Sequence, residues 1–365
     1  MSLPRLEIRL DLIRHNAEIL VGRLAQRGIE VCGVTKATLG SAEVARELLA
    51  AGVTSLGESR IDNVEHLRQR GIDAEIMLIR SPPMSQVDRV VTSTDVSLNT
   101  ELAVIEHLSA SARRQQRNHA IILMVELGDL REGIMPSDLL EVVEQVLDLP
   151  GITLRGIGTN LACQSGVIPD ASNMGQLTDL TESVEAAFGL NLSVISGGNS
   201  ANLGWALSPE SSIGRVSQLR LGEAILLGRN PTDRMGIDGL HTDAIALLGE
   251  VIESKDKPMV PAGTRGQSAF GAAKQTQGAD GTEERIIVAL GRQDIDPEGI
   301  VAPLPLTSLG ASSDHLVLTS MAPEPAAVGS VIRFTLDYSA LLRAMTSPFV
   351  ARRFLQDSST DPFMP

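Results

Sequence analysis

The sequence predicts an α/β fold in which a (β/α)8 barrel of the TIM type, residues 1–237, precedes a mostly β domain, residues 238–365. In the first part, eight short apolar runs alternate with stretches whose apolar residues recur every three or four positions, as in amphipathic helices. After residue 237 this periodicity gives way to short strands between glycine- and proline-containing turns. Strand alternating with helix predicts a parallel sheet, and eight such units predict a closed barrel.

Each predicted barrel strand is a short apolar run. In chain order the runs are VCGVT, SLGES, EIMLIR, VSLN, AIILMVEL, LRGIGTNLA, LSVISGG and LRLGEAILLG. The helical spacing is clear in SAEVARELLAAG, NTELAVIEHLSASA, PSDLLEVVEQVLDL and MGQLTDLTESVEAAFG. The opening stretch LPRLEIRLDLIRHNAEILVGRL predicts one further strand and helix, which we expect to belong partly to the second domain.

The second domain is predicted from strands that lack helices between them. They are ALLGEVIES, RIIVALG, HLVLTS and SVIRFTL. The segment from Gly271 to Glu284 is expected to be a mobile hairpin loop. The segment DPEGIVAPLPL contains three prolines, which exclude a regular helix there.

The composition excludes several classes of protein. A net charge of -14 and only eight aromatic residues, six Phe, one Tyr and one Trp, argue against a nucleic-acid surface. No apolar run is long enough to span a bilayer, and the first residues carry no secretion signal. Cys32 and Cys163 are too few for a disulfide framework, and the scattered histidines predict no metal site. We therefore expect a soluble cytoplasmic protein.

Lys36 is the first candidate for chemistry. It lies in VCGVTKATLG, at the end of the first barrel strand, beside the apolar residues Val31 and Val34. Such neighbours favour the neutral, nucleophilic amine, which can form a Schiff base with the aldehyde of pyridoxal phosphate. The alternative is an ordinary solvated lysine, because most lysines are exposed.

Two glycine-containing loops are predicted to bind the phosphate of such a cofactor. In barrels of this kind, ligands lie at the carboxyl ends of the strands, and phosphate commonly binds after the seventh and eighth. The residues that follow the seventh strand are Ser196, Gly197, Gly198, Asn199 and Ser200, and Gly222 follows Arg220 of the eighth. Bare backbone amides, a hydroxyl group and a helix N-terminus there favour an anion. A plain turn is the alternative for either loop.

These motifs together resemble those of the alanine racemase family, pyridoxal-phosphate enzymes with a barrel and a C-terminal β domain. VTKATLG resembles the lysine motif of that family, Asn-Ser-Ala at 199 to 201 its phosphate loop, and RLGEAILLG its eighth strand. The resemblance covers nearly the whole chain. GTNLACQSG, GNSANLGW and GASSDHL are more similar to the ornithine racemase branch than to true alanine racemases.

The resemblance implies roles for further cofactor-binding residues. Arg220 would face the pyridine nitrogen and keep it unprotonated, since two positive charges at that distance repel. Arg131 would lie near the phenolic oxygen of the cofactor and the substrate carboxylate, although a surface arginine beside Asp129 and Glu132 is the alternative. Asn160 occupies the place of a family histidine on the cofactor face. Glu223 joins Gly222 in the predicted cofactor site.

Racemisation needs two bases on opposite faces of the α-carbon, and only one is evident. Lys36 is one candidate. In the alanine racemases the other is a tyrosine of the partner subunit, in a Gly-Tyr-x-Asp motif that here is Gly291-Arg292-Gln293-Asp294. GASSDHL resembles the substrate-carboxylate loop, which makes Ser313 a candidate substrate-binding residue and Asp314 or His315 candidate proton carriers. A turn cap and a packed strand residue are the respective alternatives, and Cys163 could face the pocket or simply pack.

The resemblance predicts a homodimeric racemase of amino acids whose site is completed by the partner subunit. Ornithine or another basic amino acid is a candidate substrate, and its distal ammonium would need a carboxylate such as Asp294, Asp296 or Asp314. The alternatives are an aldolase, dehydratase or decarboxylase with the same cofactor and fold, an alanine racemase proper, and a protein that only carries the cofactor.

Overall fold

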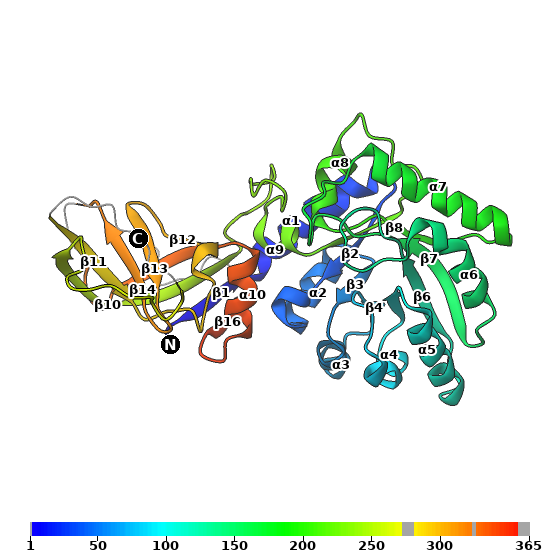
Figure 1. Cartoon of the computed structure of the whole chain (residues 1–365), viewed down its shortest axis with the longest axis horizontal. Coiled ribbons are helices and arrows are strands. Elements are labelled where there is room, and N and C mark those ends of the chain that lie inside the picture. The colour runs from blue at the N-terminus through cyan, green and yellow to red at the C-terminus, as the bar shows by residue number, and fades with distance from the viewer. Residues whose placement is uncertain (1, 272–280, 323–325, 357–365) are drawn as a thin grey trace. The chain divides into compact units, whose positions relative to one another are not determined.

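The computed structural model describes residues 2–271, 281–322 and 326–356. The chain forms two compact units (Figure 1). One comprises Leu10–Thr242, and the other comprises Met1–Arg9 together with Asp243–Pro365. In sequence terms the first corresponds to the predicted barrel and the second to the predicted β domain.

The first unit is a closed barrel of eight parallel strands, and this confirms the predicted fold class. The strands are β2 (Glu30–Val34), β3 (Ser55–Glu58), β4 (Ile76–Leu78), β5 (Val96–Asn99), β6 (His119–Met124), β7 (Ile152–Gly158), β8 (Val194–Ser196) and β9 (Gln218–Leu221). They pair in chain order, and β9 closes the barrel by pairing with β2, with Arg220 opposite Cys32. One strand therefore lies in each of the eight apolar runs.

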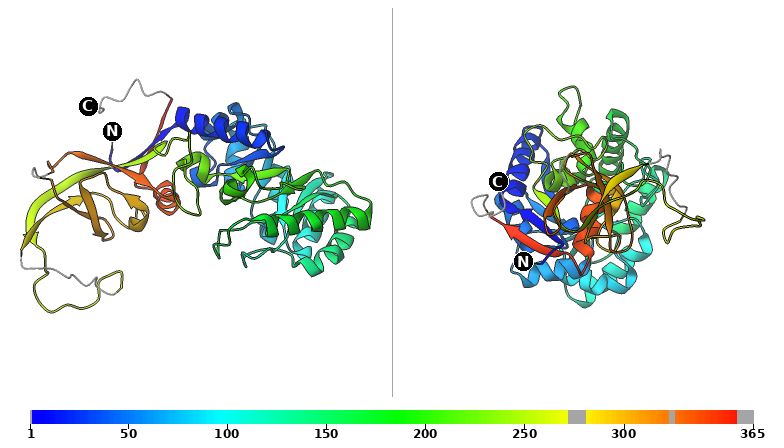
Figure 2. Two further views of the ribbon diagram at one scale, coloured as in Figure 1. Left: turned by 90° about the horizontal axis from the view of Figure 1, so that it is seen from above. Right: turned by 90° about the vertical axis from the view of Figure 1, so that its left-hand side faces the viewer.

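Helices cover the outside of these strands (Figure 1, Figure 2). They are α1 (Leu10–Ala25), α2 (Ala42–Ala50), α3 (Ile61–Gln69), α4 (Val87–Ser93), α5 (Leu102–Arg114), α6 (Leu139–Leu147), α7 (Ala171–Phe188), α8 (Leu203–Leu207) and α9 (Glu223–Leu227). Local caps set several of their limits. The Ser41 hydroxyl accepts from the Val44 amide at the start of α2, and Asp170 forms a capping box at the start of α7. Gly189 ends α7 in the left-handed conformation.

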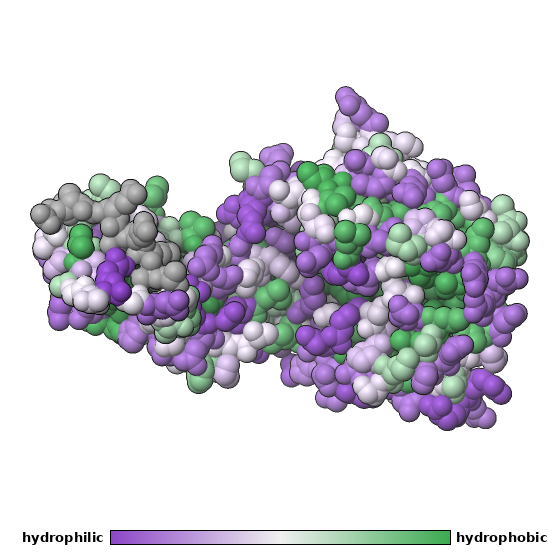
Figure 3. All heavy atoms as spheres, in the orientation of Figure 1, coloured by the Kyte–Doolittle hydropathy of each residue, from purple (hydrophilic) through white to green (hydrophobic). Residues whose placement is uncertain are grey.

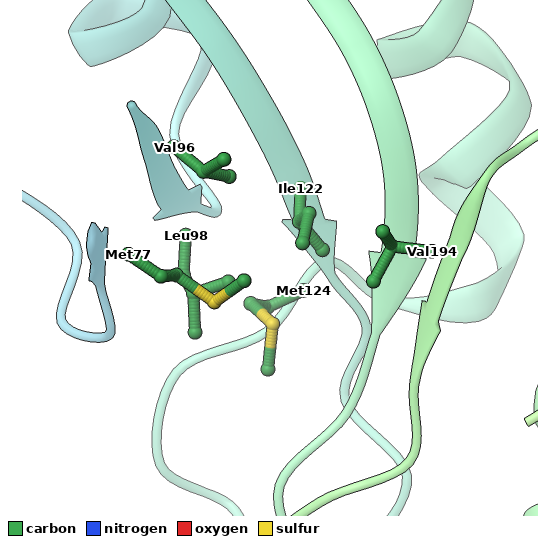
Figure 4. Packing of buried hydrophobic residues seen from close by; sticks show 6 residues of the cluster. All are labelled: Met77, Val96, Leu98, Ile122, Met124 and Val194. Carbon is green, nitrogen blue, oxygen red and sulfur yellow. The ribbon is translucent and has the colours of Figure 1, made fainter. Parts of the chain in front are cut away.

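The interior of the barrel is filled by side chains from several strands (Figure 4). The cluster consists of Met77, Val96, Leu98, Ile122, Met124 and Val194, which come from β4, β5, β6 and β8. These side chains are almost entirely removed from solvent. Because the barrel centre is a packed core, a ligand has to bind at one end of it.

The second unit is built around a mixed sheet. Its strands are β1 (Arg5–Arg9), β10 (Ile245–Pro258), β11 (Thr282–Val288), β12 (Ile300–Val301), β13 (Leu306–Ala311), β14 (Leu316–Ser320), β15 (Val331–Leu336) and β16 (Ala351–Leu355). Their order is β12-β15-β10-β11-β14-β13, and β1 pairs with both β10 and β16. The long strand β10 has an irregularity between Val251 and Glu253, where its pairing with β11 shifts register.

Long-range pairing decided the features of this unit that the sequence pattern did not specify. The structure groups β1 with the second unit because it pairs antiparallel with β10 and parallel with β16, whereas the predicted barrel range began at residue 1. Helix α10 (Tyr338–Thr346), which begins at the Asp337 cap, was not predicted. Of the loop expected between Gly271 and Glu284, residues 272–280 lie outside the described residues, and its last residues belong to β11.

The surface of each unit is largely polar on the side visible in Figure 3, where hydrophilic residues cover much of both units. Within the part of the chain that the structure describes, no helix has both the length and the apolar character required to cross a bilayer.

Candidate functional site

The predicted barrel residues gather at the carboxyl ends of five strands. Lys36 follows β2, Arg131 lies in the loop after β6, and Asn160 follows β7. The loop after β8 contains Gly198, Asn199 and Ser200, and Arg220 and Gly222 lie at the end of β9. Since the strands of a parallel barrel all end at the same rim, the structure brings these residues to one mouth of the barrel.

Lys36 is half-buried and opens a short 3-10 turn, Lys36–Thr38. The turn closes on the carbonyl oxygen of Thr35, which accepts from the Thr38 amide and hydroxyl, each at 3.0 Å, and from the Gly40 amide at 3.2 Å. Leu39 ends the turn in the left-handed conformation, with φ of 54°. Lys36 therefore belongs to a hydrogen-bonded turn that directly follows β2.

Arg220 is a buried cation among neutral groups. Its guanidinium donates to the Ser196 hydroxyl at 2.5 Å, to the Thr159 carbonyl at 2.9 Å and to the Asn160 side-chain oxygen at 3.2 Å. Among the residues described, none forms an ion pair with it. Burial lowers the pKa of Arg220 to about 10, so the side chain remains charged at neutral pH. The mouth of the barrel thus holds a positive charge that no carboxylate of the described residues contacts in an ion pair.

Asn160 connects three of the strand ends. Its side-chain oxygen accepts from Arg220 on β9. It also accepts, at 3.0 Å, from the side-chain amide of Asn199 in the loop after β8. Asn199 also donates to the carbonyl oxygen of Leu161 at 2.8 Å. Asparagine at this position therefore holds Arg220 and the β8 loop in place.

The loop after β8 is closed by Asn202, a residue that the sequence analysis did not single out. Its buried amide group accepts from the Asn199 backbone at 3.0 Å and donates to the Gly197 carbonyl at 2.9 Å. Gly198 has φ of 142°, and a Cβ atom there would lie 2.1 Å from the Asn202 side-chain oxygen. Only glycine fits at residue 198, because both the backbone conformation and the available space exclude a side chain.

Ser200 joins this loop to the end of β9. Its hydroxyl oxygen accepts from the Gly222 amide at 3.4 Å and from the Ala224 amide at 3.2 Å. The helical segments that follow are short, Ser200–Asn202 and α8, so the anion-binding capacity lies in individual amides more than in a long helix dipole. Glu223 is half-buried and begins α9 directly after Gly222.

The side chain of Ser196 forms its hydrogen bonds inside the barrel. It is fully buried, and its hydroxyl group contacts the Gln218 side-chain oxygen at 3.2 Å as well as Arg220. In this structure the Ser196 side chain orients the Arg220 guanidinium, and a contact between Ser196 and an anion stays a prediction.

Arg131 lies on a more exposed part of the rim. It pairs with Glu132 and donates to the Cys163 sulfur at 2.7 Å. Asp129, which the sequence analysis treated only as a neighbouring charge, is buried and accepts from the backbone amides of residues 163 to 165, each at 3.1 Å. Asp129 therefore ties the loop after β7 to the loop that carries Arg131. Its sequence position gave no signal for this, because an aspartate in a loop is common.

These residues fit pyridoxal phosphate. Lys36 offers an amine for the aldehyde. The Ser200 hydroxyl, whose oxygen accepts from the amides of Gly222 and Ala224, has its proton to donate to a phosphate. The space around Gly198 is closed to any side chain, as in a loop that approaches a ligand with its backbone. The uncompensated charge of Arg220 is suited to a ring nitrogen that is to stay unprotonated.

The remaining candidates lie in the β unit, in the turn between β13 and β14. Asp314 is exposed, and its carboxylate accepts from the Gln293 side-chain amide and from the Ser313 hydroxyl, each at 2.7 Å. His315 is also exposed, and its ring lies 3.5 Å from the Ser312 hydroxyl. Backbone bonds join Gln293 to Ser313 at 3.0 Å. The turn therefore presents a carboxylate and an imidazole on a braced hairpin.

Arg292 occupies the place where the family motif has a tyrosine. Its guanidinium donates to the Ala311 carbonyl at 3.2 Å and lies 5.1 Å from the centre of the Phe270 ring. It lines a cavity of about 350 Å³ together with Phe270, Gln293, Asp296, Ser313 and Arg343, among others. No tyrosine replaces the missing one in this loop.

The three carboxylates considered as partners of a distal ammonium group differ in burial and in hydrogen bonding. Asp294 is buried and accepts from the Gly291 amide and the Ser347 hydroxyl. Asp296 accepts from the Ser339 hydroxyl at 2.5 Å, and this bond lowers the pKa of its carboxyl group. Both are used within the β unit. Asp314 is the exposed member of the three.

Sequence comparison associates the chain with known racemases. Residues 8–230 match the family described as alanine racemase, N-terminal domain. The lysine racemase of Thermotoga maritima is 41% identical over 354 residues, which cover 96% of this chain and 98% of that protein. The ornithine racemase of Acetoanaerobium sticklandii is 34% identical over 356 residues, covering 96% of this chain and 99% of that protein.

Structural comparison gives the same fold. The alanine racemase from Streptomyces coelicolor A3(2) superposes with a TM-score of 0.76, over 97% of this chain and 98% of that chain. Its sequence is 20% identical, so the likeness concerns the arrangement of barrel and β domain only.

Proposed function

The chain belongs to the alanine racemase family, and from that membership we propose that it is a pyridoxal-phosphate-dependent racemase of basic amino acids, lysine or ornithine. The identity of 41% over nearly the full length of a lysine racemase is the observation that carries the proposal. A second relative of similar coverage is an ornithine racemase, and both names specify a substrate with a distal ammonium group.

The barrel residues have complementary roles in this proposal. Pyridoxal phosphate supplies the electron sink that allows the α-proton of an amino acid to leave. Lys36 would hold the aldehyde, and its amine would be the base that accepts the α-proton on one face. Ser200, oriented by the amides of Gly222 and Ala224, would donate its hydroxyl proton to the phosphate. Arg220, buried among neutral acceptors, would place its positive charge near the ring nitrogen and disfavour a proton there.

The second base is proposed to come from the β unit of another copy of the chain. Asp314 and His315 are the exposed proton carriers of the braced β13–β14 turn, and both types of side chain serve as general bases. Ser313 in the same turn would offer its backbone amide to the substrate carboxylate, opposite the guanidinium of Arg131. The proposed assembly is a homodimer in which each site contains residues of both subunits.

The function is tested by incubating the protein and pyridoxal phosphate in heavy water with single enantiomers of lysine, ornithine, arginine, alanine, serine and threonine. We expect both enantiomers of a basic amino acid, with deuterium at the α-carbon, by chiral chromatography and proton NMR. Lys36→Ala is the control and should give neither. Turnover of alanine in preference to lysine and ornithine would refute the proposed substrate class, and release of an aldehyde from threonine would indicate an aldolase.

The shared site is tested by mixing two inactive variants. Lys36→Ala lacks the barrel base, and the double variant Asp314→Ala, His315→Ala lacks the proposed β-unit bases. If sites are shared, exchange of subunits restores intact sites in about a quarter of the total, because half of the dimers are then mixed and each has one complete site. Activity that stays absent after proven subunit exchange would contradict a site shared in this way.

A further inference from the structure

Glu58 is a buried carboxyl group at the mouth of the barrel. It is the last residue of β3 and is fully removed from solvent. Among the residues described, no lysine, arginine or histidine forms an ion pair with it. Burial is the largest influence on its pKa and raises it, although several hydrogen bonds act in the opposite direction.

The hydrogen bonds of Glu58 connect the ends of two neighbouring strands. One carboxylate oxygen accepts from the Ser59 amide at 2.7 Å and from the Arg60 amide at 3.4 Å. The other accepts from the Thr35 hydroxyl at 3.1 Å. Thr35 directly precedes Lys36, and its own amide donates to the carbonyl of Gly57 at 3.0 Å. Glu58 is therefore bonded to the residue from which the lysine turn starts.

The far end of the lysine turn rests on the same group of residues. Asn63 of α3 lies beside Glu58, and its side chain lowers the pKa of the Glu58 carboxyl group. Gly40, where the turn ends, packs so closely on Asn63 that a Cβ atom at residue 40 would lie 2.9 Å from both its Cβ and its carbonyl oxygen. Glu58 is thus bonded to Thr35 at the start of the segment 35–40, and Asn63, which lies beside Glu58, packs against Gly40 at its end.

We propose that Glu58 is a positioning residue for Lys36, which it acts on through the Thr35 hydroxyl and the closed turn that follows. The proposal rests on the role of Lys36 as the residue that holds the cofactor. A buried carboxyl group without a cation costs stability relative to an apolar side chain of similar size. Its occurrence beside the reactive lysine, at the one rim where ligands bind, is typical of a functional group.

The test measures attachment of the cofactor as well as turnover. Pyridoxal phosphate is added to cofactor-free protein, and the rate constant for its attachment to Lys36 is followed by visible absorbance, alongside the melting temperature. We expect Glu58→Ala and Thr35→Val each to slow attachment roughly tenfold to a hundredfold, because small displacements of a reacting group have effects of that size. Glu58→Gln should stay close to the parent protein, since its amide can donate to the Thr35 hydroxyl and its oxygen can accept from Ser59.

Two comparisons make the result specific. The double variant of Glu58→Ala and Thr35→Val should be no slower than the slower single variant, because both changes break the same connection. Glu185→Gln is the matched control, since Glu185 of α7 contacts Arg215 and the Leu192 amide and belongs to no part of the site. It should attach the cofactor at the parent rate.

The positioning role is refuted if Thr35→Val attaches the cofactor at the parent rate, whether or not Glu58→Ala folds. It is also refuted if the rate constant of attachment falls only in proportion to the melting temperature in every variant. In that case Glu185→Gln would follow the same relation between attachment and melting temperature. Failure of the premise that Lys36 holds the cofactor is distinguishable, because in that case the parent protein itself would attach no cofactor and Lys36→Ala would not differ from it. Failure of the proposed racemase activity is distinguishable as well, because the parent protein would then attach the cofactor without racemising lysine or ornithine.

Discussion

Replacement of Arg220 by glutamine should separate stability from function. In most proteins the removal of a buried, ion-paired arginine is strongly destabilising because its carboxylate partner is left without a cation. Arg220 has no such partner among the described residues, and its three acceptors are all neutral. We therefore expect the cofactor-free Arg220→Gln protein to be about as stable as the parent.

The magnitude follows from the contacts. A pKa of about 10, against an ordinary 12.5, means that burial disfavours the charged guanidinium by about 3 kcal/mol. Glutamine removes this cost and can keep the bond to the Thr159 carbonyl. The bonds to Ser196 and Asn160 are lost. Ser196 still bonds Gln218 and Asn160 still bonds Asn199, so each loss costs only about 1 kcal/mol. The smaller side chain leaves a space that costs about 1 kcal/mol more. The net change in the free energy of unfolding is then about zero.

The assay is urea unfolding of the cofactor-free proteins at pH 7, paired with turnover of lysine and ornithine. We expect unfolding free energies within about 1 kcal/mol of each other, racemisation slower by roughly tenfold or more, and a larger share of keto acid by-product, because the charge no longer opposes protonation of the ring nitrogen. Arg215→Gln, which removes the cation that pairs with Glu185, should leave turnover unchanged. A loss of 3 kcal/mol or more in Arg220→Gln would refute the reasoning, since it would mean that the arginine is mainly structural.

Three further predictions concern other parts of the chain. Ser200→Ala should weaken pyridoxal phosphate about tenfold or more in an absorbance titration, since a hydrogen bond to a charged group contributes about 1.5–3 kcal/mol; unchanged affinity would remove Ser200 from the phosphate site. Burial lowers the pKa of His119 to about 4, so the neutral form is favoured in the folded state. Its contribution to the free energy of unfolding is complete above about pH 6.5, and about 2 kcal/mol is lost between pH 7 and pH 5 because the unfolded chain takes up the proton first. His119→Gln should flatten that part of the pH profile of urea unfolding, and an unchanged slope would contradict the assignment. Replacement of the true second base, Asp314→Asn or His315→Ala, should lower racemisation about 10² to 10⁴-fold while α-proton exchange from one enantiomer continues; if neither variant does so, the base lies elsewhere.

Much of the barrel could be predicted because strand and helix patterns are contained in consecutive residues. Each of the eight apolar runs contains a strand, although in the last run the strand ends at Leu221 and helix α9 follows. The residues after the strands lie at one rim because parallel strands end together. Lys36, Gly198 and Gly222 could be found in this way, since each directly follows a strand. For the same reason the family motifs around them were recognisable without any three-dimensional information.

Contacts between distant segments could not be found from the sequence. Asp129 binds the backbone of residues 163 to 165, and Asn202 fills the space that makes Gly198 obligatory. Glu58 resembles any acidic residue at the end of a strand until its bond to Thr35 is seen. Whether such a carboxyl group is solvated or buried depends on which strand and helix pack against it.

The amino-acid sequence alone thus determines the strand–helix units, the family and the rim on which Lys36 and the glycine loops lie, because periodicity and motif spacing are local properties. Only the tertiary structure decides that β1 joins the β unit, that Arg220 forms no ion pair with any described residue and that Glu58 is buried beside the lysine turn. These properties depend on which atoms exclude water from a given group, and that is decided by segments far apart in the chain.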